Sequence, residues 1–236
     1  MSIILAIETS SEVASCALSM GEAVLARESS GVRTHSQAIL PMIQELLAQA
    51  GITLRQCDAI AFGAGPGSFT GVRTACGIAQ GLAFGAALPV LPLVTLAAMA
   101  LACHRETGAT EILTVLDARM GEVYWAQYHY ANGLQVLAEA ALCAPGALAP
   151  LARERPLTAC GNGLSAYPQA FAQQPFASGA RADIMPHARE IALLGQIELA
   201  AGAGLPAAAA QPLYLRNKIA FTSSERLAIN AAKAGA

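Results

Sequence analysis

One stretch of this chain, residues 59–73, joins an apolar run to a glycine-rich turn, and it constrains the local fold more than any other stretch. The run Ala-Ile-Ala-Phe has the length of a short buried strand and is followed directly by the turn residues Gly63, Gly65, Pro66 and Gly67. Glycine adopts positive φ at no steric cost, whereas proline fixes φ and removes a donor. The stretch therefore predicts a tight turn between a strand and a helix.

The residues after this turn predict a helix start and a place for an anion. Ser68 or Thr70 offers an oxygen that can cap a helix N-terminus. Free N–H groups at such a terminus can bind phosphate, although the spacing is neither a Walker loop nor a Rossmann turn. Chemistry alone leaves two hypotheses open, a nucleotide or phosphate loop or a tight turn without a ligand, for Gly63, Gly65, Pro66, Gly67, Ser68 and Thr70.

The composition indicates a globular chain whose surface is partly covered by a partner. Charged residues are 13% of the 236 residues, against roughly 25% in typical soluble domains. The formal net charge of −2 argues against direct binding to nucleic acid, which usually needs a basic patch. Glu8 interrupts the N-terminal apolar run, so we expect no signal peptide and a cytoplasmic protein.

An uncharged stretch, residues 74–103, is long enough to suggest a membrane span. Pro89 and Pro92 interrupt it, and alanine and glycine dominate it. We therefore expect a helix, a short strand and a second helix inside a globular core, and no membrane association.

The order of elements repeats along the chain. An apolar run that ends in an acid occurs at residues 3–8 and again at residues 112–117, and each precedes a second predicted strand. A short strand followed by a glycine turn recurs in both parts. The sequence predicts a duplicated α/β unit that resembles the actin/Hsp70/sugar-kinase superfamily, whose nucleotide lies in the cleft between the halves. The expected division is residues 1–104, residues 105–208, and a tail, residues 209–236, that packs back toward the N-terminal half.

Two acids at predicted strand ends, Glu8 and Asp117, are the candidate cleft acids. In a kinase-like enzyme such acids hold Mg²⁺ or act as a base, and in a structural role each caps a turn. Glu8 is followed by Thr9 and Ser10, without the glycine that lets nucleotide phosphates approach in superfamily kinases. The direct analysis of the residues yields no complete catalytic constellation.

A stripe of glycines lies in the predicted helix at residues 69–86. Gly77, Gly81 and Gly85 are spaced by four and so share one face. Each interior glycine destabilises a helix by about 1 kcal/mol relative to alanine, so close approach of another backbone should offset this loss. The stripe alone favours packing on the chain's own sheet over packing on another subunit.

Six blocks of this chain together resemble the TsaB (YeaZ) family, the accessory and dimerisation subunit of tRNA threonylcarbamoyladenosine synthesis. The most specific block is Gly-x-Gly-Pro-Gly-Ser-Phe-Thr-Gly-Val-Arg at residues 63–73. The other blocks occur in the family's order at residues 4–10, 35–42, 77–82, 117–124 and 212–216.

This resemblance implies an actin-like fold and a non-catalytic role in a complex. The expected partners are the metal-bearing catalytic paralogue TsaD, the ATPase TsaE and, when the chain is alone, a second copy, with tRNA reached only through the complex. ATP and metal are expected on the partner subunits and no cofactor on this chain, because Ile39 stands where a second metal-binding His would follow His35. The alternative is an ATP-dependent kinase or hydrolase of the same fold. The resemblance places the partner interface on the first two helices, at His35, Ile39, Leu40, Ile43, Phe69, Gly77, Gly81 and Gly85.

Overall fold

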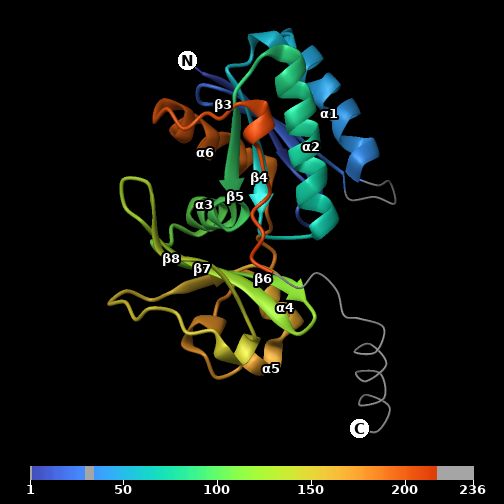
Figure 1. Ribbon diagram of the computed structural model, residues 1–236. Helices are drawn as coiled ribbons and strands as arrows, with labels where there is room; N and C mark the ends of the chain where they lie inside the picture. The colour runs from blue at the N-terminus through green and yellow to red at the C-terminus, as the bar shows by residue number, and fades with distance from the viewer. Residues whose placement is uncertain (1, 30–34, 217–236) are drawn as a thin grey trace, which may run out of the picture.

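Two β-sheets with helices on both faces make up the computed structural model, which describes residues 2–29 and 35–216 (Figure 1). The first sheet has the strand order β3-β2-β1-β4-β5 and the second the order β8-β7-β6-β9. The strands are β1 Ile3–Glu8, β2 Ala14–Met20, β3 Ala23–Ser29, β4 Ala59–Gly65, β5 Val90–Val94, β6 Glu111–Arg119, β7 Glu122–Tyr130, β8 Leu134–Cys143 and β9 Thr158–Cys160. The α-helices are α1 His35–Ala50, α2 Phe69–Ala86, α3 Thr95–Thr107, α4 Gly163–Ala166, α5 Pro168–Phe171 and α6 Ala188–Ala200. The 3₁₀ helices are η1 Leu54–Gln56, η2 Pro145–Ala147, η3 Pro175–Ala177 and η4 Ala207–Ala209.

The two sheets share one topology, which confirms the predicted duplication. β1 pairs antiparallel with β2 and parallel with β4. β6 pairs in the same way with β7 and β9. The second unit is shorter because η2 stands between β8 and β9, where the first unit has α1 between β3 and β4. The fold is therefore the predicted duplicated α/β fold of the actin/Hsp70/sugar-kinase type.

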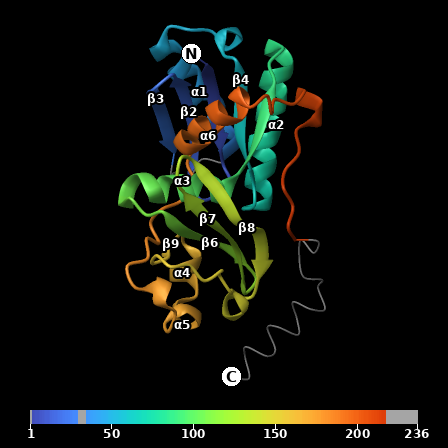
Figure 2. The same cartoon turned by 90° about the vertical axis from the view of Figure 1, so that its left-hand side faces the viewer.

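The helices that cover each sheet do not all come from the same part of the chain. α1 and α2 cover one face of the first sheet, with Ile39 and Ala79 among the core residues, and α6 covers the other face with Ile191 and Ala192. α3 covers the second sheet through Met99 and other apolar residues. The predicted boundary after residue 104 falls inside α3, between the last strand of the first sheet and the first strand of the second, and α6 crosses back over it (Figures 1 and 2).

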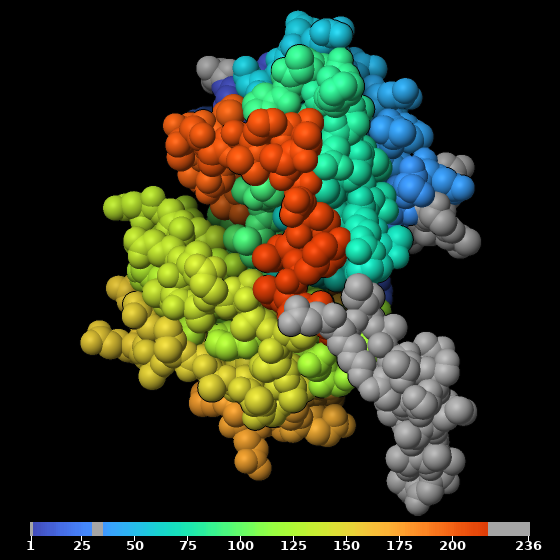
Figure 3. Space-filling model, in the orientation of Figure 1, coloured from blue at the N-terminus to red at the C-terminus, as the bar shows by residue number. Residues whose placement is uncertain are grey.

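Residues 210–216 form an extended segment, called the strap below, that runs from the first unit to the second (Figure 3). The Leu213 N–H donates to the Ala64 carbonyl oxygen at 2.8 Å. The Arg216 guanidinium binds the Glu122 carboxylate of β7. The first part of the strap lies on the N-terminal half, and the rest of the predicted tail, residues 217–236, lies outside the described residues.

The uncharged residues 74–103 fold as predicted. They form most of α2, then β5, then most of α3, and the strand between the helices belongs to the first sheet. Within residues 2–29 and 35–216, no helix combines the length and the hydropathy needed to cross a bilayer.

Candidate functional site

The glycine loop packs tightly against the end of β1. A Cβ on Gly63 would stand 1.8 Å from Glu8 Oε2, and a Cβ on Gly71 would stand 1.9 Å from the Thr9 carbonyl oxygen. Real Cβ atoms do not approach other atoms so closely, so a larger residue would have to displace the Glu8 side chain at Gly63 and the backbone at Gly71. The chain's own contacts are therefore sufficient to explain glycine here.

Ser68 is the cap of α2, one of the two residues predicted for that role. Its hydroxyl oxygen accepts a hydrogen bond from the Gly71 N–H at 3.3 Å. Thr70, the other candidate, lies exposed in the first turn and its carbonyl oxygen accepts from the Thr74 hydroxyl at 3.0 Å. The cap directs the start of α2 toward the space between the two sheets.

Two backbone donors of the loop are engaged within the chain. The Gly65 N–H donates to Thr95 Oγ1 at 3.1 Å, and the Ser68 N–H donates to the Ser10 carbonyl oxygen at 2.7 Å. Pro66, which follows a cis peptide bond, has no N–H. These donors hold the loop against the rest of the fold, and in this arrangement they are not available to a phosphate.

Glu8, the first candidate acid, is fully buried and is not among the residues that line the cavity between the units. Its carboxylate accepts a hydrogen bond from the Ser10 N–H at 2.5 Å and lies 3.5 Å from Thr95 Oγ1. Burial raises the pKa of Glu8, and the bonds from Ser10 and Thr95 act to lower it. The prediction that Glu8 faces the cleft is wrong, because the side chain fills the space left by Gly63 inside the core.

Asp117, the second candidate acid, does reach the cleft, but its carboxylate is held by neighbours. Its Oδ1 accepts from the Arg119 N–H at 2.8 Å and from the Tyr167 hydroxyl at 3.0 Å. The Arg119 guanidinium lies 3.2 Å from Oδ2. The Asp117 N–H donates to Asn162 Oδ1 at 2.9 Å. The carboxylate therefore organises the β6–β7 turn.

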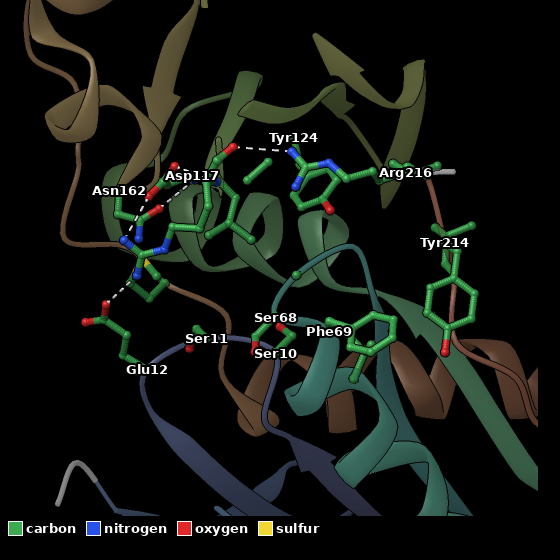
Figure 4. A pocket seen from close by; sticks show the side chains of 18 of the residues that line it. Ser10, Ser11, Glu12, Ser68, Phe69, Asp117, Tyr124, Asn162, Tyr214 and Arg216 are labelled. Atoms are coloured by element: carbon green, nitrogen blue, oxygen red, sulfur yellow. Dashed lines mark hydrogen bonds and ion pairs between the residues drawn. The ribbon is translucent and has the colours of Figure 1, made fainter. Parts of the chain in front are cut away.

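A cavity of about 500 Å³ lies between the two units (Figure 4). Ser10, Ser68 and Phe69 line it from the first unit, and Asp117 and other residues of the second unit line it from the opposite side. The Arg119 guanidinium spans the gap and lies 3.1 Å from the Glu12 carboxylate. Both side chains of this ion pair are mostly exposed, so it contributes little to stability.

The strap closes another side of this cavity. Leu213, Tyr214 and Arg216 all line it. Arg216 also donates to the Arg119 carbonyl oxygen at 3.3 Å, so the strap holds the β6–β7 turn. Arg119 and Met120 in this turn both have positive φ, near 60°, which side chains other than glycine rarely adopt.

The three glycines of α2 lie on the outside of the molecule. Gly77, Gly81 and Gly85 are exposed, and a Cβ on any of them would meet no atom within 4 Å. Phe84 beside them is 84% exposed. These four residues, called the glycine face below, do not pack on the chain's own sheet, contrary to what the stripe alone favoured.

The predicted interface residues of α1 divide between core and surface. Ile39 is 0% exposed and Ile43 is 3% exposed, and both pack in the core under the first sheet, so their prediction as partner contacts is wrong. Leu40, which is 45% exposed, points outward. His35 is half-buried, and its Nε2 lies 3.3 Å from the Glu12 carbonyl oxygen. Phe69 is partly exposed at the cavity mouth.

Several residues that shape the site were missed as individual side chains. These residues, which all line the cavity, are Arg119, Asn162, Tyr214 and Arg216. A signal was present for three of them, since Arg119, Tyr214 and Arg216 belong to blocks that carry the family resemblance. Among residues 2–29 and 35–216 no three His, Cys, Asp or Glu side chains gather as a metal site would require, and the six cysteines are free thiols.

Comparison with known proteins places the whole chain among proteins of one pathway. The family model described as TsaD, tRNA N6-adenosine threonylcarbamoyltransferase, matches residues 23–233. The tRNA threonylcarbamoyladenosine biosynthesis protein TsaB of Escherichia coli (strain K12) is 38% identical over 226 residues, which cover 92% of this chain and 96% of that protein. The protein of the same name from Haemophilus influenzae is 38% identical over 92% of this chain and 95% of its own length.

A solved structure gives the same result for the fold. YeaZ from Pseudomonas aeruginosa superposes with a TM-score of 0.86 at 39% sequence identity, covering 91% of this chain and 100% of that chain. The likeness in fold therefore extends over both sheets.

Proposed function

The chain belongs to the TsaB (YeaZ) family, and from that membership we propose that it serves tRNA threonylcarbamoyladenosine biosynthesis as a non-catalytic partner subunit. In this proposal it dimerises with the catalytic paralogue TsaD through α2 and the exposed side of α1. The ATPase TsaE docks on that pair, and tRNA is bound only through the complex. Its place is the cytoplasm, where tRNAs are modified.

The glycine face is the observation that carries this proposal. Three interior glycines destabilise α2 by about 1 kcal/mol each, and no contact within the described residues accounts for them. A large exposed aromatic side chain, Phe84, stands beside them. A helix of another protein packed on this face would gain close backbone approach and bury Phe84, which would offset the loss.

The cleft supports a non-catalytic role. A magnesium–nucleotide site needs open backbone donors and free carboxylates, yet the N–H groups of Gly65 and Ser68 are engaged and Glu8 is buried. Asp117 is bound by Arg119 and Tyr167. The residues do not fit a nucleotide in this arrangement, so ATP-dependent kinase or hydrolase activity is the weaker alternative, and ATP and metal are assigned to the partner subunits.

A surface substitution tests the proposal directly. Gly81→Leu places a bulky side chain at the centre of the glycine face, where an added Cβ has open space around it. We expect the monomer to stay folded and its association with TsaD to fall at least about tenfold, as for an interface hot spot. Size-exclusion chromatography with light scattering and titration calorimetry measure the homodimer and the complex with TsaD, respectively.

The matched control is Gly146→Leu, because Gly146 is exposed and equally free of neighbours but lies in η2 on the second unit. This control should bind like the wild-type chain. Reconstituted tRNA modification should require the wild-type chain and weaken with Gly81→Leu. A wild-type chain that neither binds TsaD nor affects modification would refute the proposed function.

A further inference from the structure

Arg73 is the single formal charge within α2, and its side chain is held in one orientation on the surface. The centre of its guanidinium lies 3.4 Å from the Phe69 ring centroid and 5.3 Å from that of Tyr214. Its Nε donates to the Tyr214 hydroxyl at 2.8 Å. Both rings are partly exposed, so the cluster stands at the surface where α2, the strap and the cavity mouth meet.

The bonding capacity of this guanidinium is only partly used. Arginine has five N–H donors, and Arg73 engages the one on Nε. Within the described part of the chain no acceptor takes a hydrogen bond from its terminal N–H groups, and no carboxylate lies within ion-pair distance. Stacking on a ring orients the plane without consuming those donors. The outer edge of the Arg73 guanidinium, which carries the terminal N–H groups, is therefore pre-organised to bind two oxygen atoms side by side.

The surface formed by α1 and α2 offers cations and no unpaired acid. Arg55 lies at the other end of the glycine face, where its Nη2 donates to the Gly85 carbonyl oxygen at 3.2 Å. α2 contains no acidic residue, and Glu45, the one acid in α1, lies 3.7 Å from the Arg27 guanidinium. A partner that buries this surface must supply the negative charge itself.

We propose that Arg73 binds a carboxylate of the protein that docks on the glycine face, and that this contact selects a carboxylate-bearing partner over a second copy of this chain. The inference rests on the proposed function, and it adds the chemistry by which the partner is recognised. Arginine prefers a two-point contact with carboxylate, and such contacts give both affinity and orientation. Arg and Tyr are also the residue types enriched at energetic centres of interfaces.

A second copy does not satisfy this requirement. When two copies pack through α1 and α2, each brings Arg73 and Arg55, and the one acid of those helices, Glu45, is already paired with Arg27. The guanidinium then stays without a carboxylate, and like charges at both ends oppose the pairing. Self-association through this surface is therefore weaker than association with an acidic partner, and the homodimer exchanges into the heterodimer.

The test compares three substitutions of Arg73 with one control. Arg73→Glu should weaken binding to TsaD at least about 30-fold, and Arg73→Met should weaken it about tenfold. The affinity of Arg73→Lys for TsaD should lie between that of the wild type and that of Arg73→Met. Self-association of Arg73→Glu should stay equal or strengthen. The control is Arg155→Glu, because Arg155 is exposed and lies on the second unit, away from α2.

Charge-swap rescue separates recognition from a structural role. Each exposed acid of TsaD is changed to Lys, and one of these variants should bind Arg73→Glu more tightly than it binds the wild-type chain. Circular dichroism melting confirms that each variant is folded. If TsaD binds Arg73→Glu or Arg73→Met as tightly as it binds the wild-type chain, the inference is overturned and the proposed function stands. The same holds if the variants lose affinity for TsaD and for self-association equally. Absence of wild-type binding would overturn both.

Discussion

Glycines occur in two neighbouring regions of this molecule for opposite reasons. In the loop and first turn of α2, a Cβ on Gly63 or Gly71 would overlap an atom of β1 or of the turn after it. Further along the same helix, a Cβ on Gly77 or Gly81 would meet open space. The first group is explained by contacts inside the chain, whereas no contact within the described residues explains the second group, which we assign to the proposed partner interface.

This difference changes how the most specific motif of the sequence is understood. The loop has the form of a phosphate-binding turn, but its glycines let β4 and α2 pack against the end of β1. The helix that follows presents the open surface. The loop thus positions the helix that follows it. Substitutions of the loop glycines and of the exposed helix glycines should therefore change the free energy of unfolding in opposite directions.

The largest effect is expected for Gly71→Ala. The new Cβ would lie 1.9 Å from the Thr9 carbonyl oxygen, so the backbone must shift. Overpacking of this kind should lower the free energy of unfolding by about 3 kcal/mol. Urea denaturation measures the change, and Gly77→Ala in the next turn is the control. A loss below about 1 kcal/mol would show that the loop tolerates side chains and would remove the contrast.

The combined variant Gly77→Ala, Gly81→Ala and Gly85→Ala should change stability in the opposite direction. Alanine is favoured in helices by about 1 kcal/mol per site, so the monomer should gain about 2–3 kcal/mol. Urea denaturation at concentrations below self-association measures this gain. Binding to TsaD should weaken at the same time, because the methyl groups keep the partner's backbone at a distance. A less stable monomer would mean that these glycines serve the fold after all.

Glu8→Gln should give the smallest effect, and its sign depends on pH. Burial raises the folded-state pKa of Glu8 above 4.5, so the folded chain holds this proton at higher pH than the unfolded chain does. The resulting stabilisation is present at low pH and is lost as pH rises through the folded-state pKa. Glutamine stays neutral, so at pH 7 the variant should be more stable by about 1 kcal/mol, the order of the desolvation cost of a buried polar group.

A pH series of urea denaturation checks this prediction for Glu8. The difference in the free energy of unfolding between Glu8→Gln and the wild type should grow from pH 4 to pH 7. Reconstituted tRNA modification should continue with the variant, since the side chain packs against Gly63 and does not line the cavity. Complete loss of modification with a stable fold would instead assign Glu8 a chemical role.

Helices and strands were predicted well from the sequence because apolar periodicity, turn residues and caps are encoded in neighbouring residues. The bounds of α2, the hairpin of β2 and β3, and the acid at the end of β1 and within β6 follow from periodicity, turns and caps. The duplication followed from two short matches in the same order. The packing of α6 on the first sheet had no such signal, because helical periodicity shows an apolar face but not which sheet covers it.

The same limit explains the mixed outcome at the predicted interface. Ile39 and Ile43 share an apolar face of α1. The spacing of apolar residues in the sequence is the same whether that face packs on the chain's own sheet or on another protein. The structure places both in the core. The spacing of Gly77 was likewise compatible with packing inside the chain or on another protein, and the structure places Gly77 on the surface. Arg73 could not be singled out, because its stacking on Phe69 and Tyr214 joins residues 141 positions apart.

The crossing of α6 onto the first sheet has a consequence for synthesis. The face of the first sheet that includes Ile4 and Leu91 is covered by Ile191 and Ala192. A ribosome makes the last strand of that sheet about a hundred residues before it makes these side chains. The nascent N-terminal half therefore emerges with part of its apolar surface uncovered, and its folding is completed only after the residues of α6 have been made.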